Sequence, residues 1–191
     1  MTPTGEDNAP YLQEDVADGV LAERAIDGDS AAFDLLCRRH VPMMRGFVAR
    51  ILRSISDADD VVQDSLLLAW RQLPTLRDPT SVRSWLMKIA SRQALTHVRR
   101  RPTARPLPEW EITLPREAEP ENCAIRHAQL RALSAALDAL SDDQRQCWLL
   151  REIAELSYEQ IAEELEISPS NVRGKLARAR ASVYAQMEGW R

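Results

Sequence analysis

The sequence predicts an all-α protein built from two small helical domains that are joined by a proline-rich linker. Glycine is scarce, with 6 residues in 191, and Ala, Leu, Arg and Glu, which favour helices over strands, are abundant. Apolar residues recur with a helical period of i, i+3, i+4 and i+7 on both sides of the chain's middle. Five of the eleven prolines fall between residues 102 and 120, so no packed element is expected there.

The first domain is expected to span residues 19–101, after an acidic, disordered tail at 1–18. Its helices are predicted at about 19–28, from Asp29 or Ser30 onward past Pro42, from Ser56 to about Leu73, and from Val82 to residue 101. Ser56-Asp57-Ala58-Asp59 fits the capping box [ST]-x-x-[DE], which indicates that the third helix begins there.

The third predicted helix carries DADDVVQDSLLLAW at 57–70, with four aspartates in eight positions. Asp57 and Asp59 would lie in its first turn, where negative charge complements the helix dipole. The helical period predicts a buried face of Val62, Leu66, Ala69 and Trp70. It places a neighbouring, more polar face at Asp60, Gln63, Asp64 and Leu67. Asp60 and Asp64 repel each other at a cost of a few tenths of a kcal/mol, which a basic partner surface could recover.

After the linker, predicted at 102–122, residues 123–191 are expected to form the second domain. A periodic helix covers 125–140, and Ser141-Asp142-Asp143-Gln144 and Ser157-Tyr158-Glu159-Gln160 are capping boxes. Ser168 can cap a further helix that has Pro169 at its first position. The domain therefore also consists of helices.

Residues 157–180, SYEQIAEELEISPSNVRGKLARAR, have the layout of a helix-turn-helix. A short helix ends at Leu165, a turn passes through Glu166 and Ile167, and a basic helix follows. The apolar contacts between the two helices are assigned to Ile161, Leu165, Ile167, Val172 and Leu176. The candidate DNA-contacting positions on the second helix are Ser170, Asn171, Arg173, Gly174, Lys175, Ala177 and Arg178. The alternative is an amphipathic helical hairpin whose basic face is only solvated.

Charge is strongly segregated along the chain, although the net charge is only −4. Two stretches lack acids, Pro79 to Pro108 and Ile167 to Met187, whereas 138–166 hold nine acids. Basic residues of the first stretch offer the positive field that nucleic-acid phosphates need. The residues expected to provide this field are Arg83, Lys88, Arg92, Arg99 and Arg100. Two confined basic blocks on an acidic protein indicate two polyanion contacts.

Several functional classes are not expected. No apolar run approaches the roughly 20 residues that span a bilayer, and the acidic N-terminus does not resemble a signal peptide, so a cytoplasmic protein is predicted. Cys37, Cys123 and Cys147 are widely spaced and are interpreted as structural thiols in a reducing compartment. No cofactor, metal or catalytic residue is predicted.

The chain from about residue 20 to 188 resembles bacterial RNA polymerase sigma factors of the extracytoplasmic-function (ECF) group. Residues 25–52 are similar to the first half of sigma region 2, and DADDVVQDSLLLAW is similar to the family's acidic polymerase-docking helix. SVRSWLMKIASRQALTHVRRR at 81–101 resembles the segment that reads the −10 promoter element. Residues 140–180 resemble region 4, which reads the −35 element.

The resemblance implies a promoter-specificity subunit without enzymatic activity of its own. The resemblance implies three partners: core RNA polymerase, promoter DNA and an anti-sigma factor. The contact with polymerase is expected at the coiled coil and the flap of its large subunit. The implied polymerase-binding residues are Asp60, Gln63, Asp64 and Leu67. The implied −10 contacts are Arg77, Asp78, Arg83, Lys88, Arg92, Arg99 and Arg100, and the implied −35 contacts are the helix-turn-helix positions given above. Arg92, Thr96 and Val82 depart from the family's frequent Asn, Asp and Phe, which leaves the −10 sequence preference open.

Two other functions would each account for only part of the sequence. A helix-turn-helix repressor or activator that works without polymerase would explain residues 157–180 but would leave the acidic helix and the −10-like segment without a role. A metal-dependent hydrolase using the aspartates would need helical His partners for those acids or a Gly-rich phosphate loop, and the sequence has neither.

Overall fold

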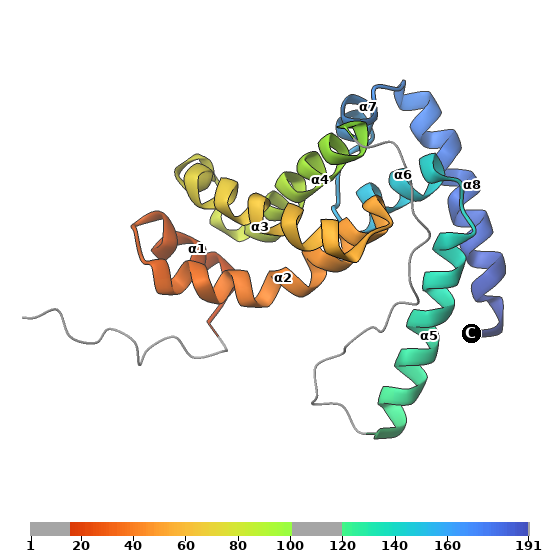
Figure 1. Cartoon of the computed structure of the whole chain (residues 1–191), viewed down its shortest axis with the longest axis horizontal. Coiled ribbons are helices and arrows are strands. Elements are labelled where there is room, and N and C mark those ends of the chain that lie inside the picture. Colours follow the sequence, from red (N-terminus) through yellow and green to blue (C-terminus); the bar gives the residue numbers. More distant parts are fainter. Residues whose placement is uncertain (1–15, 101–119, 191) are drawn as a thin grey trace, which may run out of the picture.

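A computed structural model describes residues 16–100 and 120–190, and every regular element in these ranges is a helix (Figure 1). The α-helices are α1 Asp18–Ile26, α2 Ser30–Leu52, α3 Ile55–Gln72, α4 Val82–Arg100, α5 Pro120–Asp138, α6 Asp142–Glu152, α7 Tyr158–Leu165 and α8 Pro169–Met187. Short 3-10 turns occupy Leu73–Thr75, Pro79–Ser81 and Glu188–Trp190. The predicted tail before residue 16 and the predicted linker up to residue 119 lie outside the described residues, and α5 begins at Pro120, inside the range predicted as linker.

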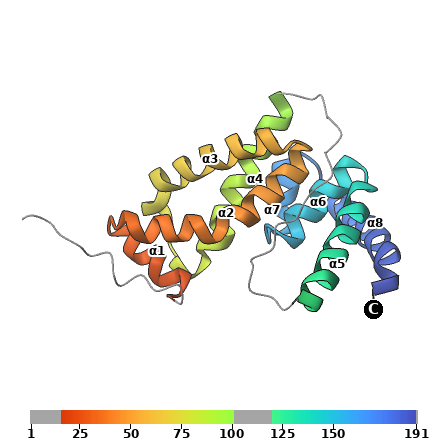
Figure 2. The same cartoon turned by 60° about the horizontal axis from the view of Figure 1, so that its bottom comes forward.

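The first domain packs α1, α3 and α4 against the long helix α2 (Figures 1 and 2). Asp29 caps α2 by accepting hydrogen bonds from the backbone N–H groups of Ala31 and Ala32. The helix continues through Pro42 without ending there. Leu36, Met44 and Val48 are fully buried on one side of α2, as the 3.6-residue period requires.

The start of α3 differs from the prediction. The helix begins at Ile55, and Ser54 caps it by accepting a hydrogen bond from the N–H of Asp57 at 3.3 Å, so the box starting at Ser56 is wrong as the helix start. The reason is the preceding residue: Arg53 adopts a left-handed φ of 53° that ends α2. Ser54 is then extended, with the backbone geometry of an N-cap residue.

The second domain packs α8 against α5, α6 and α7. Both predicted capping boxes are present, Ser141 with Gln144 and Ser157 with Gln160, and each closes the reciprocal pair of hydrogen bonds. Ser168 caps α8 through the N–H of Asn171. Two of the three helices, α6 with 11 residues and α7 with 8, are so short that their length alone would leave them marginal.

The two domains are in contact. Helix α2 contacts α6 and α4 contacts α7, and Figure 1 shows the C-terminal end of α4 beside α7. The buried apolar residues of both domains form one connected cluster. Among the described residues, none of the helices is sufficiently long and apolar to span a bilayer.

Candidate nucleic-acid and protein-binding surfaces

Helix α3 presents the acidic surface, defined here as Asp60, Gln63, Asp64 and Leu67. All four residues are exposed, and Leu67 is 52% exposed. The opposite side of the helix is held by Ala58, Val62 and Ala69, which are buried. Asp60 and Asp64 have no ion-pair partner in the described part of the chain. The helix therefore offers two uncompensated carboxylates beside an exposed leucine.

The other two aspartates of the cluster have partners within the first domain. Asp59 binds Arg45 through two hydrogen bonds of 2.5 and 3.0 Å, and Asp57 lies 3.8 Å from Nε2 of His97. Asp57 occupies the first turn of α3, as predicted, whereas Asp59 lies beyond it. Across the described ranges, no three His, Cys, Asp or Glu side chains are grouped so as to hold a metal ion.

Trp70 was predicted in the buried face of α3, and this is wrong. The Trp70 ring packs on Phe33 of α2, with the ring centroids 4.9 Å apart, but Trp70 is 40% exposed. It lies one helical turn from Leu67 and extends the acidic surface by an aromatic edge. The sequence does indicate that Leu67 and Trp70 lie side by side, because residues three apart are neighbours on a helix surface.

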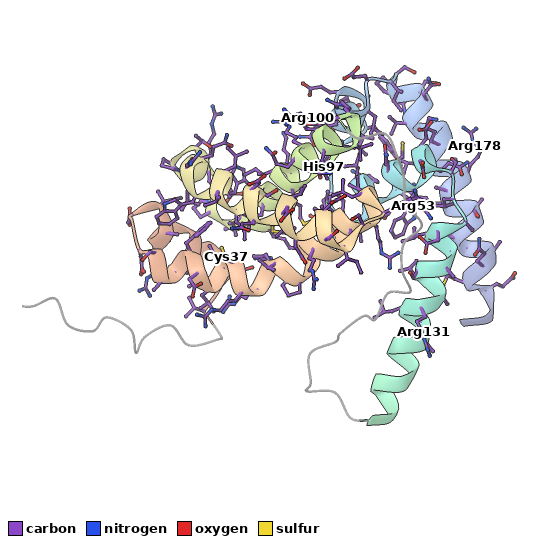
Figure 3. All side chains as sticks on the ribbon, in the orientation of Figure 1. Cys37, Arg53, His97, Arg100, Arg131 and Arg178 are labelled. Atoms are coloured by element: carbon purple, nitrogen blue, oxygen red, sulfur yellow. The ribbon has the colours of Figure 1, made fainter. Side chains whose placement is uncertain are left out.

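Helix α4 carries the basic residues of the first acid-free stretch. Arg83, Arg92 and Arg99 keep about half of their side-chain surface exposed, at 49, 51 and 52%. Leu86, Ile89, Ala90 and Ala94 bury the opposite side of the helix. Arg100 ends the helix (Figure 3), where a cation complements the negative end of the helix dipole. The arginines are thus presented by a helix that the core holds in place.

The loop before α4 is organised by Asp78. Its carboxylate accepts hydrogen bonds from the backbone N–H and hydroxyl of Thr80, at 3.0 and 2.6 Å, and from the Ser81 hydroxyl at 2.6 Å. The Ser81 hydroxyl, then that of Thr80, lowers the pKa of Asp78. With its acceptors engaged in this way, Asp78 shapes the loop, while neighbouring Arg77 is exposed.

The helix-turn-helix has the predicted parts. Helix α7 ends at Leu165, Glu166 follows with a left-handed φ of 56°, and α8 begins at Pro169. Ile161, Val172 and Leu176 are buried between the helices, whereas Leu165 and Ile167 are partly buried against them. A left-handed residue suits glycine best, so the chain accepts a backbone cost at Glu166.

The outer side of α8 collects most of the predicted DNA contacts. Ser170, Asn171, Arg173, Ala177 and Arg178 are exposed, and Figure 3 shows Arg178 on α8. Arg173 lies over the Tyr158 ring at 6.0 Å, and Arg151 lies over the same ring at 5.3 Å. Tyr158, which the sequence analysis named only within a capping box, therefore lies beneath the guanidinium group of the exposed Arg173.

Two of the predicted positions on α8 have a different environment. The ammonium of Lys175 is 2.5 Å from Asp143, and its side chain is only 21% exposed. A Cβ added at Gly174 would meet only the Arg178 guanidinium, at 3.7 Å. No neighbouring group of the described chain therefore requires glycine at this position.

Cys37 and Cys147, the cysteines whose side chains the structure describes, form no disulfide with each other. Cys147 is buried in α6 and Cys37 is half-buried in α2. Burial raises the pKa of each thiol to about 11. Neither is a candidate nucleophile, since a reactive cysteine has a lowered pKa.

Two family models match the chain: Sigma-70 region 2 over residues 36–103, and Sigma-70, region 4 over residues 130–183. The "ECF RNA polymerase sigma-E factor" of Salmonella typhimurium is 31% identical over 182 residues, covering 90% of this chain and 95% of the relative. The "RNA polymerase sigma-H factor" of Pseudomonas aeruginosa is 30% identical over 179 residues, covering 87% and 91%.

Two solved structures share the fold. CnrH in complex with the cytosolic domain of CnrY has a TM-score of 0.54 at 26% identity, covering 91% of this chain and 99% of that one. The sigma factor RpoE of Bartonella quintana, in complex with the anti-sigma factor NepR, has a TM-score of 0.56 at 21% identity, covering 82% and 96%. With both sigma regions matched and full-length relatives at 31% identity, the chain belongs to the sigma-70 family, in its extracytoplasmic-function group of RNA polymerase sigma factors.

Proposed function

We propose that this sigma factor binds core RNA polymerase through the acidic surface of α3. It then directs initiation at promoters whose −10 element is read by α4 and its preceding loop, and whose −35 element is read by α8. Sigma factors regulate transcription, and no catalytic step is assigned to this chain. Since its partner is core polymerase, its expected place of action is the cytoplasm.

The acidic surface is the observation that carries the proposal. Asp60 and Asp64 stay uncompensated although arginine is common in this domain, and Leu67 and Trp70 add exposed apolar area beside them. Interfaces are anchored by such aromatic and aliphatic groups, and complementary charge steers the encounter. A DNA-binding protein that works without polymerase would have no use for this surface.

The two promoter contacts are supported by charge and placement. Arg83, Arg92 and Arg99 lie along α4, and Arg173 and Arg178 lie on the exposed side of α8. Guanidinium groups bind phosphate and guanine in a bidentate manner, which suits both backbone contact and base readout.

Control by an anti-sigma factor is supported by the relatives. CnrH, at 26% identity, was solved with the cytosolic domain of CnrY. We therefore expect a protein partner that binds this sigma factor in place of polymerase.

The decisive test is co-elution with core polymerase. Asp64→Lys should abolish or strongly weaken association, because it places a cation where a basic partner surface is expected, whereas Glu23→Lys on α1, an exposed residue with the same charge change, should not. Both variants should retain the circular dichroism of the wild type. Equal binding by Asp64→Lys and wild type would refute the docking assignment, and DNA binding without any polymerase association would instead support the repressor alternative.

A further inference from the structure

The arginines of α4 are already occupied by the second domain. Nη1 of Arg83 is 2.9 Å from a carboxylate oxygen of Glu155, and Arg92 pairs with Glu164. Arg99 donates to the backbone carbonyl of Glu164 at 2.6 Å and lies 3.7 Å from the Glu166 carboxylate. Three of the basic residues assigned to −10 DNA thus face one glutamate cluster of the second domain, defined as Glu155, Glu164 and Glu166.

A second contact holds the domains together away from these arginines. At the end of α2, Arg53 lies 4.0 Å from Asp142. Burial lowers the pKa of the neighbouring Arg50, and the charge of Asp138 opposes this shift. Figure 3 shows Arg53 where α2 approaches the helices of the second domain. Both contacts join arginines of the first domain to carboxylates of the second.

Two of the three glutamates are placed by a backbone conformation that suits glycine better. Glu155 and Glu166 have left-handed φ values of 58° and 56°, in the turns that precede and follow α7. Glycine would adopt this conformation without strain. Glutamate at each turn therefore carries a backbone cost that glycine would avoid. In both cases the carboxylate contacts an arginine of α4.

Carboxylate and phosphate compete for the same guanidinium donors, since both accept the bidentate fork. We propose that free sigma factor adopts a closed state in which Glu155, Glu164 and Glu166 take the place of DNA phosphates on Arg83, Arg92 and Arg99. The proposal rests on the assignment of α4 to the −10 element. In this state α4 cannot bind −10 DNA, whereas Arg173 and Arg178 on α8 remain exposed.

The closed state is suited to opening when a partner binds. Two of its ion pairs, Arg83 with Glu155 and Arg99 with Glu166, are about half exposed or more on both sides, and exposed pairs are individually weak and screened by salt. The chain between Arg100 and Pro120 is long enough to span about 65 Å when extended. A partner that fits only the separated domains would shift the population toward the open state by its differential affinity.

The first test measures the shape of the free full-length chain by small-angle X-ray scattering. Glu155→Lys combined with Glu164→Lys should increase the radius of gyration. Glu163→Lys combined with Glu188→Lys makes the same charge change at exposed residues of the same domain and should leave it unchanged. Adding Arg83→Glu and Arg92→Glu to the first variant restores opposite charges and should return the wild-type value.

The second test measures DNA binding without polymerase, using a fluorescent single-stranded 12-mer of random sequence. If the closed state predominates by about ten to one, opening should raise the affinity by about tenfold over the Glu163/Glu188 control. Arg92→Ala in the opened variant should remove much of this gain. If the lysine variant does not fold, Glu155→Gly combined with Glu166→Gly replaces it, because glycine relieves the backbone cost at both turns. This variant should also raise the affinity for the single strand.

An unchanged radius of gyration in both the lysine and the glycine variant would overturn the closed state. Expansion without a gain in DNA affinity over the control would overturn its inhibitory role. Failure of wild type to bind core polymerase would instead refute the proposed function, because the scattering measurement does not depend on that binding.

Discussion

Trp70 of α3 lies against Phe33 of α2, with the ring centroids 4.9 Å apart and the ring planes inclined at 54°. The contact holds an indole that is 40% exposed at the edge of the acidic surface. Tryptophan is among the residues that contribute most to binding at protein interfaces. The pair therefore gives α3, which we propose docks on polymerase, a fixed apolar edge in addition to its charge.

Trp70→Ala should weaken the binding of core polymerase by about tenfold or more, equivalent to at least ~1.4 kcal/mol. Phe33→Leu is the matched control, because it removes the aromatic pair, worth about 0.5–1.5 kcal/mol, but leaves the indole in the sequence. It should lower the free energy of unfolding and affect polymerase binding less. Fluorescence anisotropy with labelled sigma factor measures the affinities, and equal effects of the two substitutions would count against a docking role for Trp70.

Arg173 and Lys175 should differ in their effects on −35 recognition although they are two residues apart. Arg173→Ala should cost about 1–3 kcal/mol of duplex affinity and relax sequence preference at one position. Lys175→Ala should cost less, because its ammonium is engaged by Asp143 at 2.5 Å. Selection from a randomised duplex library checks this prediction, and a loss of specificity in Lys175→Ala alone would reverse the assignment.

Gly174→Ala should make the protein more stable and bind DNA less tightly. The added Cβ meets nothing closer than 3.7 Å, and alanine is favoured over glycine in a helix interior by about 1 kcal/mol. Chemical denaturation should show the gain, while binding of a −35 duplex should weaken because the methyl group occupies space that DNA would use. Unchanged DNA affinity would mean that Gly174 does not face the DNA.

Cys37 and Cys147 should be far less reactive in the native protein than in the unfolded chain. Burial raises the pKa of both from 9.0 to about 11, so at pH 8 the thiolate fraction falls by about a hundredfold. Because the folded pKa is the higher one, this contribution to stability is present below pH 9.0 and is lost as the pH rises toward about 11. Iodoacetamide labelling followed by peptide mass spectrometry checks this, and equal native and denatured rates at pH 8 would contradict it.

The sequence predicted those features that depend on neighbouring residues. The boxes at Ser141 and Ser157 and the cap at Ser168 form as expected, because a capping side chain bonds to the backbone only two or three residues away. The helix-turn-helix follows from these caps and from the apolar spacing. The all-α class and the family, sigma-70 of the ECF group, are confirmed.

The incorrect predictions arose where two local signals compete or where the partner is distant in sequence. Ser54 and Ser56 both satisfy the capping pattern, with Asp57 and Asp59 respectively, and the left-handed Arg53 decides for Ser54. The position of Trp70 along α3 fits the buried stripe. Its ring contact is with Phe33, which lies on another helix and is distant in sequence. Periodicity reports which residues share a face and not how far the core extends under it.

The pairing of α4 with the second domain joins residues 65 to 72 positions apart, so no local pattern could reveal it. It has a consequence for exchanging modules between related sigma factors. A hybrid that kept residues 16–100 and received a relative's second domain would retain Arg83, Arg92 and Arg99 but would take their partners at positions 155, 164 and 166 from the relative. The −10 preference would then come from one parent, whereas the −35 preference and the restraint on α4 would come from the other. A transplanted domain could therefore alter the background activity of a synthetic circuit as well as its −35 preference.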